Sequence, residues 1–561
     1  MTELYVILLV VLAFIVVAFL LGFRDRVVAR RMLIKKLNNE YGKEPQRNYK
    51  AKDREHISGF YKNHREGFQI DDTTWNDLNM DSVYDRMDYC LSAAGEEYLY
   101  YMLRTPKQTD DFDDIEKKIS LFNKDADLRL KVQLIFSDIG NISKFSIYDY
   151  IDHLKNVGNS GNTIHYVMLV LLVLSVVYSF VNFTVGFAAF LLIMVAQIIM
   201  YFRIKGDIDP YLTTYSYIMR VVKSIDSFGS ISDEALSEDI RQLKEISKDF
   251  ASFKAFSSIL LSPTRMSGTG NPLDILLDYL RMVTHADIIK FNQMYRQIME
   301  KKDQLDQVLE ITGRIEAAIS IAYFRASFEG SYVIPEFGGG TFGVKELFHP
   351  LIENAVPNDI VSERGVLITG SNASGKSTFL KTCAINAIFA QSIHTVLGKN
   401  YRAPLYRIYS SMALKDDIFE GDSYYIVEIK SIKRILDAAA GQGCQVLCFV
   451  DEVLRGTNTV ERIAASTQIL KELSREKVQC FAATHDIELT SLLKEEYDIY
   501  HFEGDVTDND VKFDYMIKSG PATTRNAIRL LSVLGYEKEL VENAQKMADG
   551  FLEKGSWEAA F

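Results

Sequence analysis

Long stretches without charged side chains dominate the hydrophobic pattern of the first half of the chain. Residues 4–23 and residues 166–202 contain no Asp, Glu, Lys or Arg, and Asn182-Phe183-Thr184 forms a polar break in the second stretch. About 20 apolar residues are enough for a helix to cross the hydrocarbon core of a membrane. The first stretch therefore predicts a transmembrane anchor. The second predicts a hairpin of two spans, Ile164–Val181 and Val185–Phe202.

Each stretch has an alternative interpretation. Residues 4–23 could be a cleaved signal peptide, but Glu3 is the only charge before them and no convincing cleavage site follows. Residues 166–202 could be a helical hairpin buried in a soluble core, but they lack polar positions at helical spacing. Basic residues follow both stretches: Arg24, Arg26, Arg30, Arg31, Lys35 and Lys36 after the first, and Arg203 and Lys205 after the second. Because such residues concentrate on the cytoplasmic side, we expect a multi-pass protein of the cell membrane, with residues 24–163 and 204–561 in the cytoplasm.

The segment that follows the predicted anchor, up to residue 66, is strongly basic. Its further basic residues include Lys43, Arg47, Lys50, Lys52, Arg54, Lys62 and Arg65. Attraction to anionic lipid, together with the topology rule, is the favoured interpretation, which makes membrane lipid a predicted partner. A DNA-binding arm is the alternative.

Helical periodicity dominates residues 208–330. Apolar residues recur at helical spacing from Ile218 to Ile225 and again from Ile288 to Ile298, which predicts long helices. Pro263, Gly268, Gly270 and Pro272 predict a loop between them. Gly338-Gly339-Gly340 predicts a hinge.

Beyond this hinge the pattern changes to apolar runs typical of buried strands. Val366-Leu367-Ile368 predicts a strand, and residues 379–390 predict a helix. The segment that joins them satisfies G-x-x-x-x-G-K-[ST]: Gly370, Ser371, Asn372, Ala373, Ser374, Gly375, Lys376, Ser377 and Thr378. A strand, a glycine loop and a helix in this order form a phosphate-binding loop. Lys376 is expected to reach the β- and γ-phosphates of ATP, and the Ser377 hydroxyl to bind Mg²⁺.

Two later strands carry polar residues at their ends. The strand that begins at Gln445 is apolar from Val446 to Val450 and leads into Asp451 and Glu452, and Ala482-Ala483-Thr484 leads into His485. Asp451 is expected to hold Mg²⁺ and Glu452 to polarise the attacking water. Solvated acids capping a strand and a structural histidine are the alternatives. The order of the motifs favours the catalytic interpretation, in which His485 senses the γ-phosphate.

Together these motifs closely resemble the ATPase domain of the MutS family. The resemblance rests on the loop from Gly370 to Thr378, on residues 421–428, on the D-E-x-x-R-G-T-x-T run from Asp451 to Thr459, and on residues 483–489. A weaker resemblance to the start of the MutS core/lever domain covers residues 70–78, 90–96 and 103–106. An LSGGQ signature typical of transporter ATPases is absent.

The resemblance implies a homodimer with nucleotide at composite sites, where Ser423 of one subunit would contact the nucleotide of the other. It also shows departures. Ala355 stands where the family often has an aromatic residue near adenine, and no second base-contacting residue is evident near Ile517. No N-terminal domain with a Phe-x-Glu wedge fits this chain, so mismatch recognition by that wedge is not expected.

The predicted fold class is an α/β P-loop ATPase domain of the ABC/MutS type, joined to a long-helix core/lever region and three transmembrane helices. The predicted segments are an anchor (1–23), a basic juxtamembrane segment (24–66), the first part of the core/lever domain (67–163), a transmembrane hairpin (164–204), a helical lever domain (205–345) and the ATPase domain (346–561).

The predicted function is that of a membrane-bound ATPase that uses ATP and Mg²⁺ to drive lever motion, with a possible role in DNA transactions. The net charge of −12 argues against a general nucleic-acid coat protein. The alternative is a membrane ATPase of transporter or scaffold type without a DNA role. The cysteines are scattered and predict buried free thiols in a reducing compartment: Cys90, Cys383, Cys444, Cys448 and Cys480.

Overall fold

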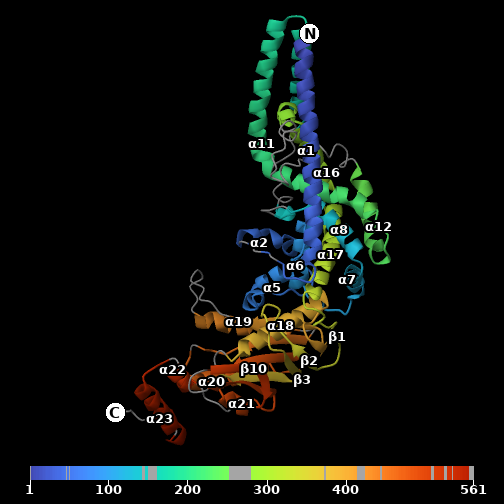
Figure 1. Cartoon of the computed structure of the whole chain (residues 1–561). Coiled ribbons are helices and arrows are strands. Elements are labelled where there is room, and N and C mark those ends of the chain that lie inside the picture. The colour runs from blue at the N-terminus through green and yellow to red at the C-terminus, as the bar shows by residue number, and fades with distance from the viewer. Residues whose placement is uncertain are drawn as a thin grey trace. The chain divides into compact units, whose positions relative to one another are not determined.

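A computed structural model describes most of the chain (Figure 1). The described residues are 2–45, 47, 49, 51–141, 146–149, 161–251, 279–371, 374–412, 424–441, 445–455, 457–506, 511–522, 527–533 and 535–554. They form two compact units that are interleaved along the chain. Unit 1 comprises Met1–Arg65, Met87–Tyr101 and Asp113–Ser327, and unit 2 comprises Glu66–Arg86, Met102–Phe112 and Phe328–Phe561. The predicted segment 67–163 thus contributes residues to both units.

Unit 1 is helical. Its elements are α1 (Thr2–Glu40), α2 (Ala51–Ile57), α3 (Gly59–Asn63), most of α6 (Ala93–Arg104), α7 (Asp113–Lys124), α8 (Ala126–Ile139), α10 (Thr163–Ser179), α11 (Phe183–Phe228), the short 3₁₀ helix η1 (Glu234–Leu236), α12 (Ser237–Asp249), α16 (Ala286–Glu300) and α17 (Lys302–Ala326). Helix α17 is buried on nearly all sides between Leu305 and Arg325, as expected for a helix at the centre of a core. The prediction of long helices between residues 208 and 330 is confirmed by α11, α12, α16 and α17.

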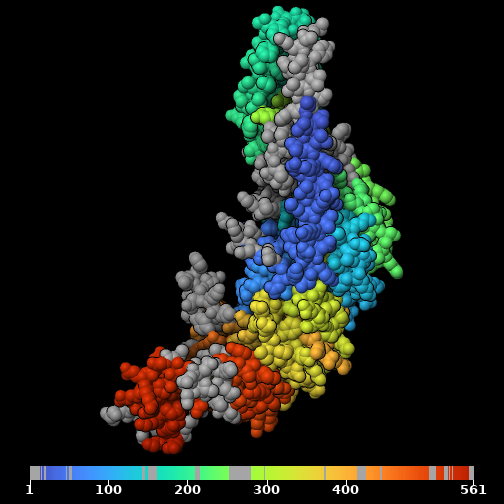
Figure 2. All heavy atoms as spheres, in the orientation of Figure 1, coloured from blue at the N-terminus to red at the C-terminus, as the bar shows by residue number. Residues whose placement is uncertain are grey.

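The predicted apolar hairpin is present as α10 and α11, which run side by side (Figure 1). Asn182 caps the start of α11, because its side chain accepts a hydrogen bond from the Val185 backbone N–H at 3.2 Å. Many large apolar side chains of the hairpin are exposed, among them Leu174, Phe180 and Leu192. On the face drawn in Figure 2, the outer side of the hairpin is not covered by other described parts of the chain.

The expectation of three spanning helices is not met. Among the residues whose side chains the structure describes, one helix is long and apolar enough to cross a membrane: Phe183–Gly206, with a mean hydropathy of 2.4. Helix α10 is apolar and has 17 residues, about 25 Å at 1.5 Å per residue, which is the lower end of the length range for a spanning helix. The predicted anchor lies in α1, whose first side chains mostly fall outside the described residues.

One residue of the basic juxtamembrane segment is directed into the protein rather than towards lipid. The Arg47 guanidinium lies 2.7 Å from Glu96 Oε1 and 3.2 Å from Asp88 Oδ2, and both carboxylates are fully buried. A buried carboxylate without a cation would be costly. Arg47 therefore neutralises buried carboxylates in the core of unit 1. The basic composition of the segment did not predict this role.

Unit 2 contains a six-stranded sheet in the order β10-β9-β4-β8-β7-β6 and a smaller sheet in the order β1-β5-β2-β3. The strands are β1 (Glu336–Phe337), β2 (Phe342–Leu347), β3 (Asn358–Ser362), β4 (Gly365–Gly370), β5 (Lys399–Ala403), β6 (Tyr406–Ser411), β7 (Gln445–Asp451), β8 (Val478–Thr484), β9 (Tyr497–Val506) and β10 (Val511–Ser519). Within the large sheet, only β10 pairs antiparallel to its neighbour.

The helices of unit 2 are α4 (Asp72–Asp77), α5 (Met80–Met87), α18 (Lys376–Ile393), α19 (Tyr424–Ala440), α20 (Thr459–Glu472), α21 (Glu488–Leu492), α22 (Ala527–Val533) and α23 (Lys538–Lys554). The predicted strands in the motif region are confirmed by β4, β7 and β8, and the predicted helix over residues 379–390 by α18.

Helix α4 covers the edge strand β6 of the large sheet. Thr74 Oγ1 accepts a hydrogen bond from the Ser410 backbone N–H at 3.1 Å. Asp77 Oδ2 accepts from Ser410 Oγ at 2.7 Å and from the Met412 backbone N–H at 2.9 Å. These contacts satisfy polar groups of a sheet edge that β6 would otherwise leave unpaired, and they explain why residues 66–86 belong to unit 2.

Candidate functional site

The ends of three neighbouring strands define the site. Strands β4, β8 and β7 are adjacent and parallel, so their carboxyl ends lie at one edge of the sheet. Gly370 ends β4, Asp451 ends β7, and His485 directly follows β8. Ligands of open α/β sheets bind beyond this edge.

The loop between β4 and α18 requires glycine at both of its ends. Gly370 has a φ of 144°, and a Cβ there would lie 2.5 Å from the Phe502 carbonyl oxygen. Gly375 precedes α18 with a φ of 107°. These conformations let the loop turn back toward the first turn of α18, whose free N–H groups favour an anion.

Lys376 is the first residue of α18, and it is 5% exposed. Its Nζ donates to the carbonyl oxygens of Gly370 at 2.8 Å and Ser371 at 2.9 Å. Burial lowers the pKa of Lys376 to about 8, although Asp451 and Glu452 act in the opposite direction. The hydroxyl of Ser374 is buried and finds no hydrogen-bond partner among the residues that the structure describes.

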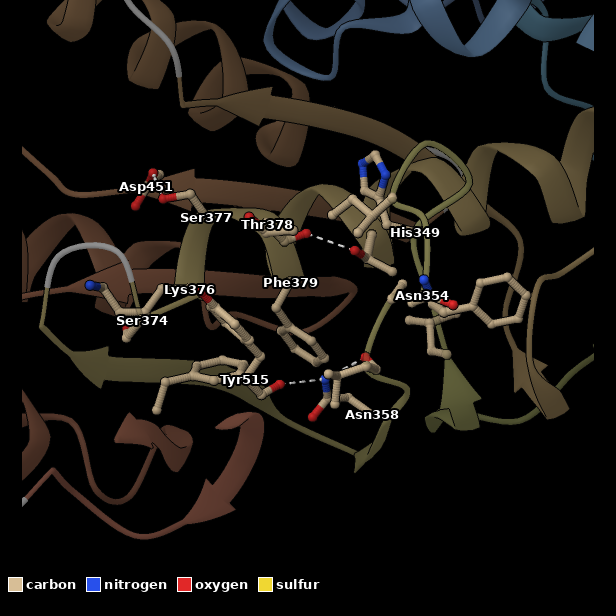
Figure 3. A pocket seen from close by; sticks show the side chains of 18 of the residues that line it. His349, Asn354, Asn358, Ser374, Lys376, Ser377, Thr378, Phe379, Asp451 and Tyr515 are labelled. Atoms are coloured by element: carbon tan, nitrogen blue, oxygen red, sulfur yellow. Dashed lines mark hydrogen bonds between the residues drawn. The ribbon is translucent and has the colours of Figure 1, made fainter. Parts of the chain in front are cut away.

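Ser377 and Asp451 form the part of the site suited to a divalent cation. Ser377 Oγ donates to Asp451 Oδ2 at 2.5 Å (Figure 3). Mg²⁺ prefers oxygen ligands and keeps several water molecules, so one carboxylate and one hydroxyl suffice from the protein. No cluster of three or more His, Cys, Asp or Glu with metal-site geometry occurs within the described part of the chain.

The side chains of His485 and Arg455 both contact the Glu452 carboxylate. His485 Nε2 lies 2.6 Å from Oε1, and Arg455 Nε lies 2.7 Å from Oε2. His485 Nδ1 also lies 2.9 Å from the Gly370 carbonyl oxygen. Burial acts to raise the pKa of Glu452, but the His485 hydrogen bond and the Arg455 charge outweigh it and leave the pKa below its usual value.

These residues line a cleft of about 680 Å³ (Figure 3), within the usual size range for small-molecule sites. The predicted residues that line it are Ser374, Gly375, Lys376, Ser377, Thr378, Asp451, Glu452 and His485. Gly370 and Ser371 adjoin it through their contacts with Lys376. Asn372, Ala373 and Ser423 lie outside the described residues. The roles assigned to these residues remain predictions.

Tyr515 in β10 lines the cleft and was missed by the sequence analysis. Its φ is 54°, and the pairing of β10 with β9 shifts between Phe513 and Ile517. The Asn358 side chain holds this irregularity, because it donates to the Tyr515 carbonyl at 3.0 Å and accepts from the Ile517 N–H at 2.7 Å. The ring lies against the glycine loop, since a Cβ on Gly375 would be 3.3 Å from Tyr515 Cδ1.

Aromatic rings from several elements line the cleft, Phe348 and Phe502 among them. Tyr515 and Phe379 both line it (Figure 3), while Ala355 lines it without an aromatic ring. Aromatic faces stack well on planar bases. The sequence signal was the aromatic pair Phe513 and Tyr515, just upstream of the position near Ile517 where such a residue was sought.

Comparison with known proteins agrees with the motif analysis. Residues 366–552 match the family model described as MutS domain V. The chain is 29% identical over 262 residues to the DNA mismatch repair protein MutS of Thermus aquaticus, which covers 46% of this chain and 32% of that protein. It is 27% identical over 280 residues to the protein of the same name from Pseudothermotoga lettingae, covering 48% and 34%. The similarity thus spans about a third of the length of these relatives and supports the MutS family.

Proposed function

We propose that this chain is a membrane-bound ATPase of the MutS family that hydrolyses ATP in the cleft beyond β4, β7 and β8. The observation that carries the proposal is the convergence of Lys376, the Ser377–Asp451 pair and the Glu452–His485 pair on one cleft. These side chains supply a cation for phosphate, oxygen ligands for Mg²⁺ and a carboxylate for water activation.

The residues present fit ATP with Mg²⁺. Ser374 offers a buried hydroxyl that lacks a described partner, and the two loop glycines adopt the positive φ values that the course of the loop requires. Ser377 and Asp451 would hold Mg²⁺, which when bound neutralises phosphate charge. Lys376 would bind the β- and γ-phosphates.

The remaining polar groups act on the water and the γ-phosphate. Glu452 would accept a proton from, or orient, the attacking water, and His485 would contact the γ-phosphate. Tyr515 would lie against the base and provide the aromatic face that Ala355 does not. Release of Glu452 from Arg455 would free one oxygen, Oε2, for the water.

We further propose a homodimer in which Ser423 of the partner subunit completes each site, as the family resemblance implies. The relatives named above are DNA mismatch repair proteins. DNA is therefore the first candidate for the molecule that stimulates ATP turnover. The exposed apolar hairpin favours the second candidate, an ATPase that acts on a membrane process without DNA.

The test is steady-state ATP turnover by the purified full-length protein with and without duplex DNA. We expect turnover that needs Mg²⁺ and stops with a chelator. Stimulation of several-fold by DNA supports a DNA transaction. Turnover indifferent to DNA supports the second candidate, and absence of turnover under all conditions contradicts the proposed function.

We also propose that the hairpin spans the membrane, with its turn outside and unit 2 in the cytoplasm. Val181, 80% exposed beside the turn, and Lys538, whose side chain is 91% exposed on α23, are suitable reporters. Each would be replaced by Cys in a chain without the native cysteines, and intact cells would be treated with an impermeant maleimide. We expect Val181→Cys to react at once and Lys538→Cys only after lysis. Reaction of Lys538→Cys on intact cells, or extraction of the protein by carbonate, would contradict this arrangement.

A further inference from the structure

The segment that carries Glu452 has an unusual backbone. Glu452 and Leu454 both have a φ of 61°, in the left-handed region. Side chains other than Gly are disfavoured there, and such conformations persist only where the surroundings fix them. The loop formed by residues 452–455 must therefore be held from outside.

Three neighbouring elements hold this loop. The Glu452 N–H donates to the Ala483 carbonyl of β8 at 2.9 Å. Ser466 Oγ of α20 donates to the Val453 carbonyl at 3.2 Å. The third contact comes from Glu428 of α19, which the sequence motifs included without a role.

Glu428 makes the most extensive of these contacts. It is 1% exposed, and its Oε1 accepts the Leu454 N–H at 2.5 Å. The Arg455 N–H lies 3.4 Å from Oε1 and 3.3 Å from Oε2. One carboxylate thus receives two successive backbone N–H groups.

A charged group at this buried position is costly unless its oxygens accept hydrogen bonds. Burial raises the pKa of Glu428, while the N–H groups of Leu454 and Arg455 act to lower it. An amide would offer one oxygen, and its NH₂ group would face a second N–H donor. The carboxylate thus offers an acceptor oxygen to each N–H group, whereas an amide would offer one oxygen for both.

The loop also positions a side chain that contacts Glu452, the candidate catalytic carboxylate. Arg455 belongs to it and contacts both Glu452 Oε2 at 2.7 Å and the Asp451 carbonyl at 3.0 Å. Glu428 itself does not line the cleft. Movement of the loop would displace Glu452 and Arg455 while leaving the glycine loop in place.

We propose that Glu428 is a positioning residue, which fixes the left-handed loop 452–455 and thereby aims the Glu452 carboxylate. This inference rests on the proposed ATPase function. It assigns Glu428 an effect on the rate of hydrolysis and none on nucleotide binding. Misplacement of a reacting group by about 1 Å can cost on the order of 100-fold in rate.

The first test compares Glu428→Gln with the parent protein in full-length form. We expect kcat for ATP to fall about 10- to 100-fold and the Kd of a fluorescent ATP analogue to stay within about twofold. Asp437→Asn is the matched control, because Asp437 lies on the same helix with a 64% exposed side chain that pairs with Lys433. Its kcat should equal that of the parent.

The second test asks whether Glu428 acts through Glu452. In a Glu452→Gln background, Glu428→Gln should change the residual kcat by less than about twofold, because residues that act as a unit are not additive. A further tenfold fall would mean an independent role and would overturn the proposal. If Glu428→Gln does not fold, Ser466→Ala loosens the same loop from α20 and should lower kcat in the same direction.

The outcomes separate the two proposals. A slow Glu452→Gln variant beside a Glu428→Gln variant as fast as the parent overturns this inference alone. A parent protein without turnover, or a Glu452→Gln variant as fast as the parent, contradicts the proposed ATPase function. Loss of nucleotide binding in folded Glu428→Gln also overturns the positioning role.

Discussion

Glu452→Gln is expected to lower steady-state ATP turnover by about 100-fold or more, because it removes the carboxylate that would polarise the attacking water. Nucleotide affinity should stay within a few-fold, since Lys376 and the Ser377–Asp451 pair are unchanged. Under these conditions ATP accumulates on the enzyme. We expect a longer-lived closed dimer, measurable as an ATP-dependent shift in size-exclusion chromatography.

The matched control for this prediction is Glu472→Gln. Glu472 is half-exposed near the end of α20 and pairs with Arg475, outside the set of residues that line the cleft. Its turnover should equal that of the parent. Parental turnover in Glu452→Gln would assign water activation to another group.

Lys376→Ala should act on binding rather than on the chemical step alone. A charge-assisted hydrogen bond to phosphate contributes roughly 1.5 to 3 kcal/mol, so the Kd for ATP should rise about 10- to 100-fold. Equilibrium binding of a fluorescent ATP analogue measures this effect. Lys471→Ala, which removes a partly exposed ion pair with Glu496 outside the set of residues that line the cleft, should bind like the parent.

The lowered pKa of Lys376 adds a pH signature. With a pKa of about 8, the side chain is mainly charged at pH 7 and loses its proton as the pH rises through 8. Above that pH, binding through the charged form must take up a proton, so the Kd for ATP should rise by up to about tenfold per pH unit. The terminal phosphate is already deprotonated in this range. This dependence of the Kd on pH should disappear in Lys376→Ala. If it persists, a group other than Lys376 titrates in this range.

The strands that form the site could be predicted from the sequence, because strands of a buried parallel sheet consist of nearly continuous apolar runs. Val366-Leu367-Ile368 and residues 446–450 are such runs, and both lie in the large sheet. The polar residues that end these runs then share one edge. At this site, the apolar pattern of the sequence and the strand arrangement of the folded protein agree.

Features that depend on long-range packing were not predictable in this way. Tyr515 reaches the cleft through a strand irregularity held by Asn358, more than 150 positions away in the chain. Arg47 is basic like its neighbours, and only the position of Glu96 shows that it is structural. The docking of α4 on β6 through Asp77 likewise depends on a partner over 300 residues distant.

Helix α11 contains one position at which bending is expected. It is a single helix of 46 residues, about 70 Å long, whose first half carries the exposed apolar surface and whose last half is buried from Tyr215 to Phe228. Pro210 lies between the halves and cannot donate a hydrogen bond to the Gly206 carbonyl one turn earlier. The turn at residues 206–210 therefore lacks one backbone hydrogen bond. We expect α11 to bend there in preference to the rest of its length.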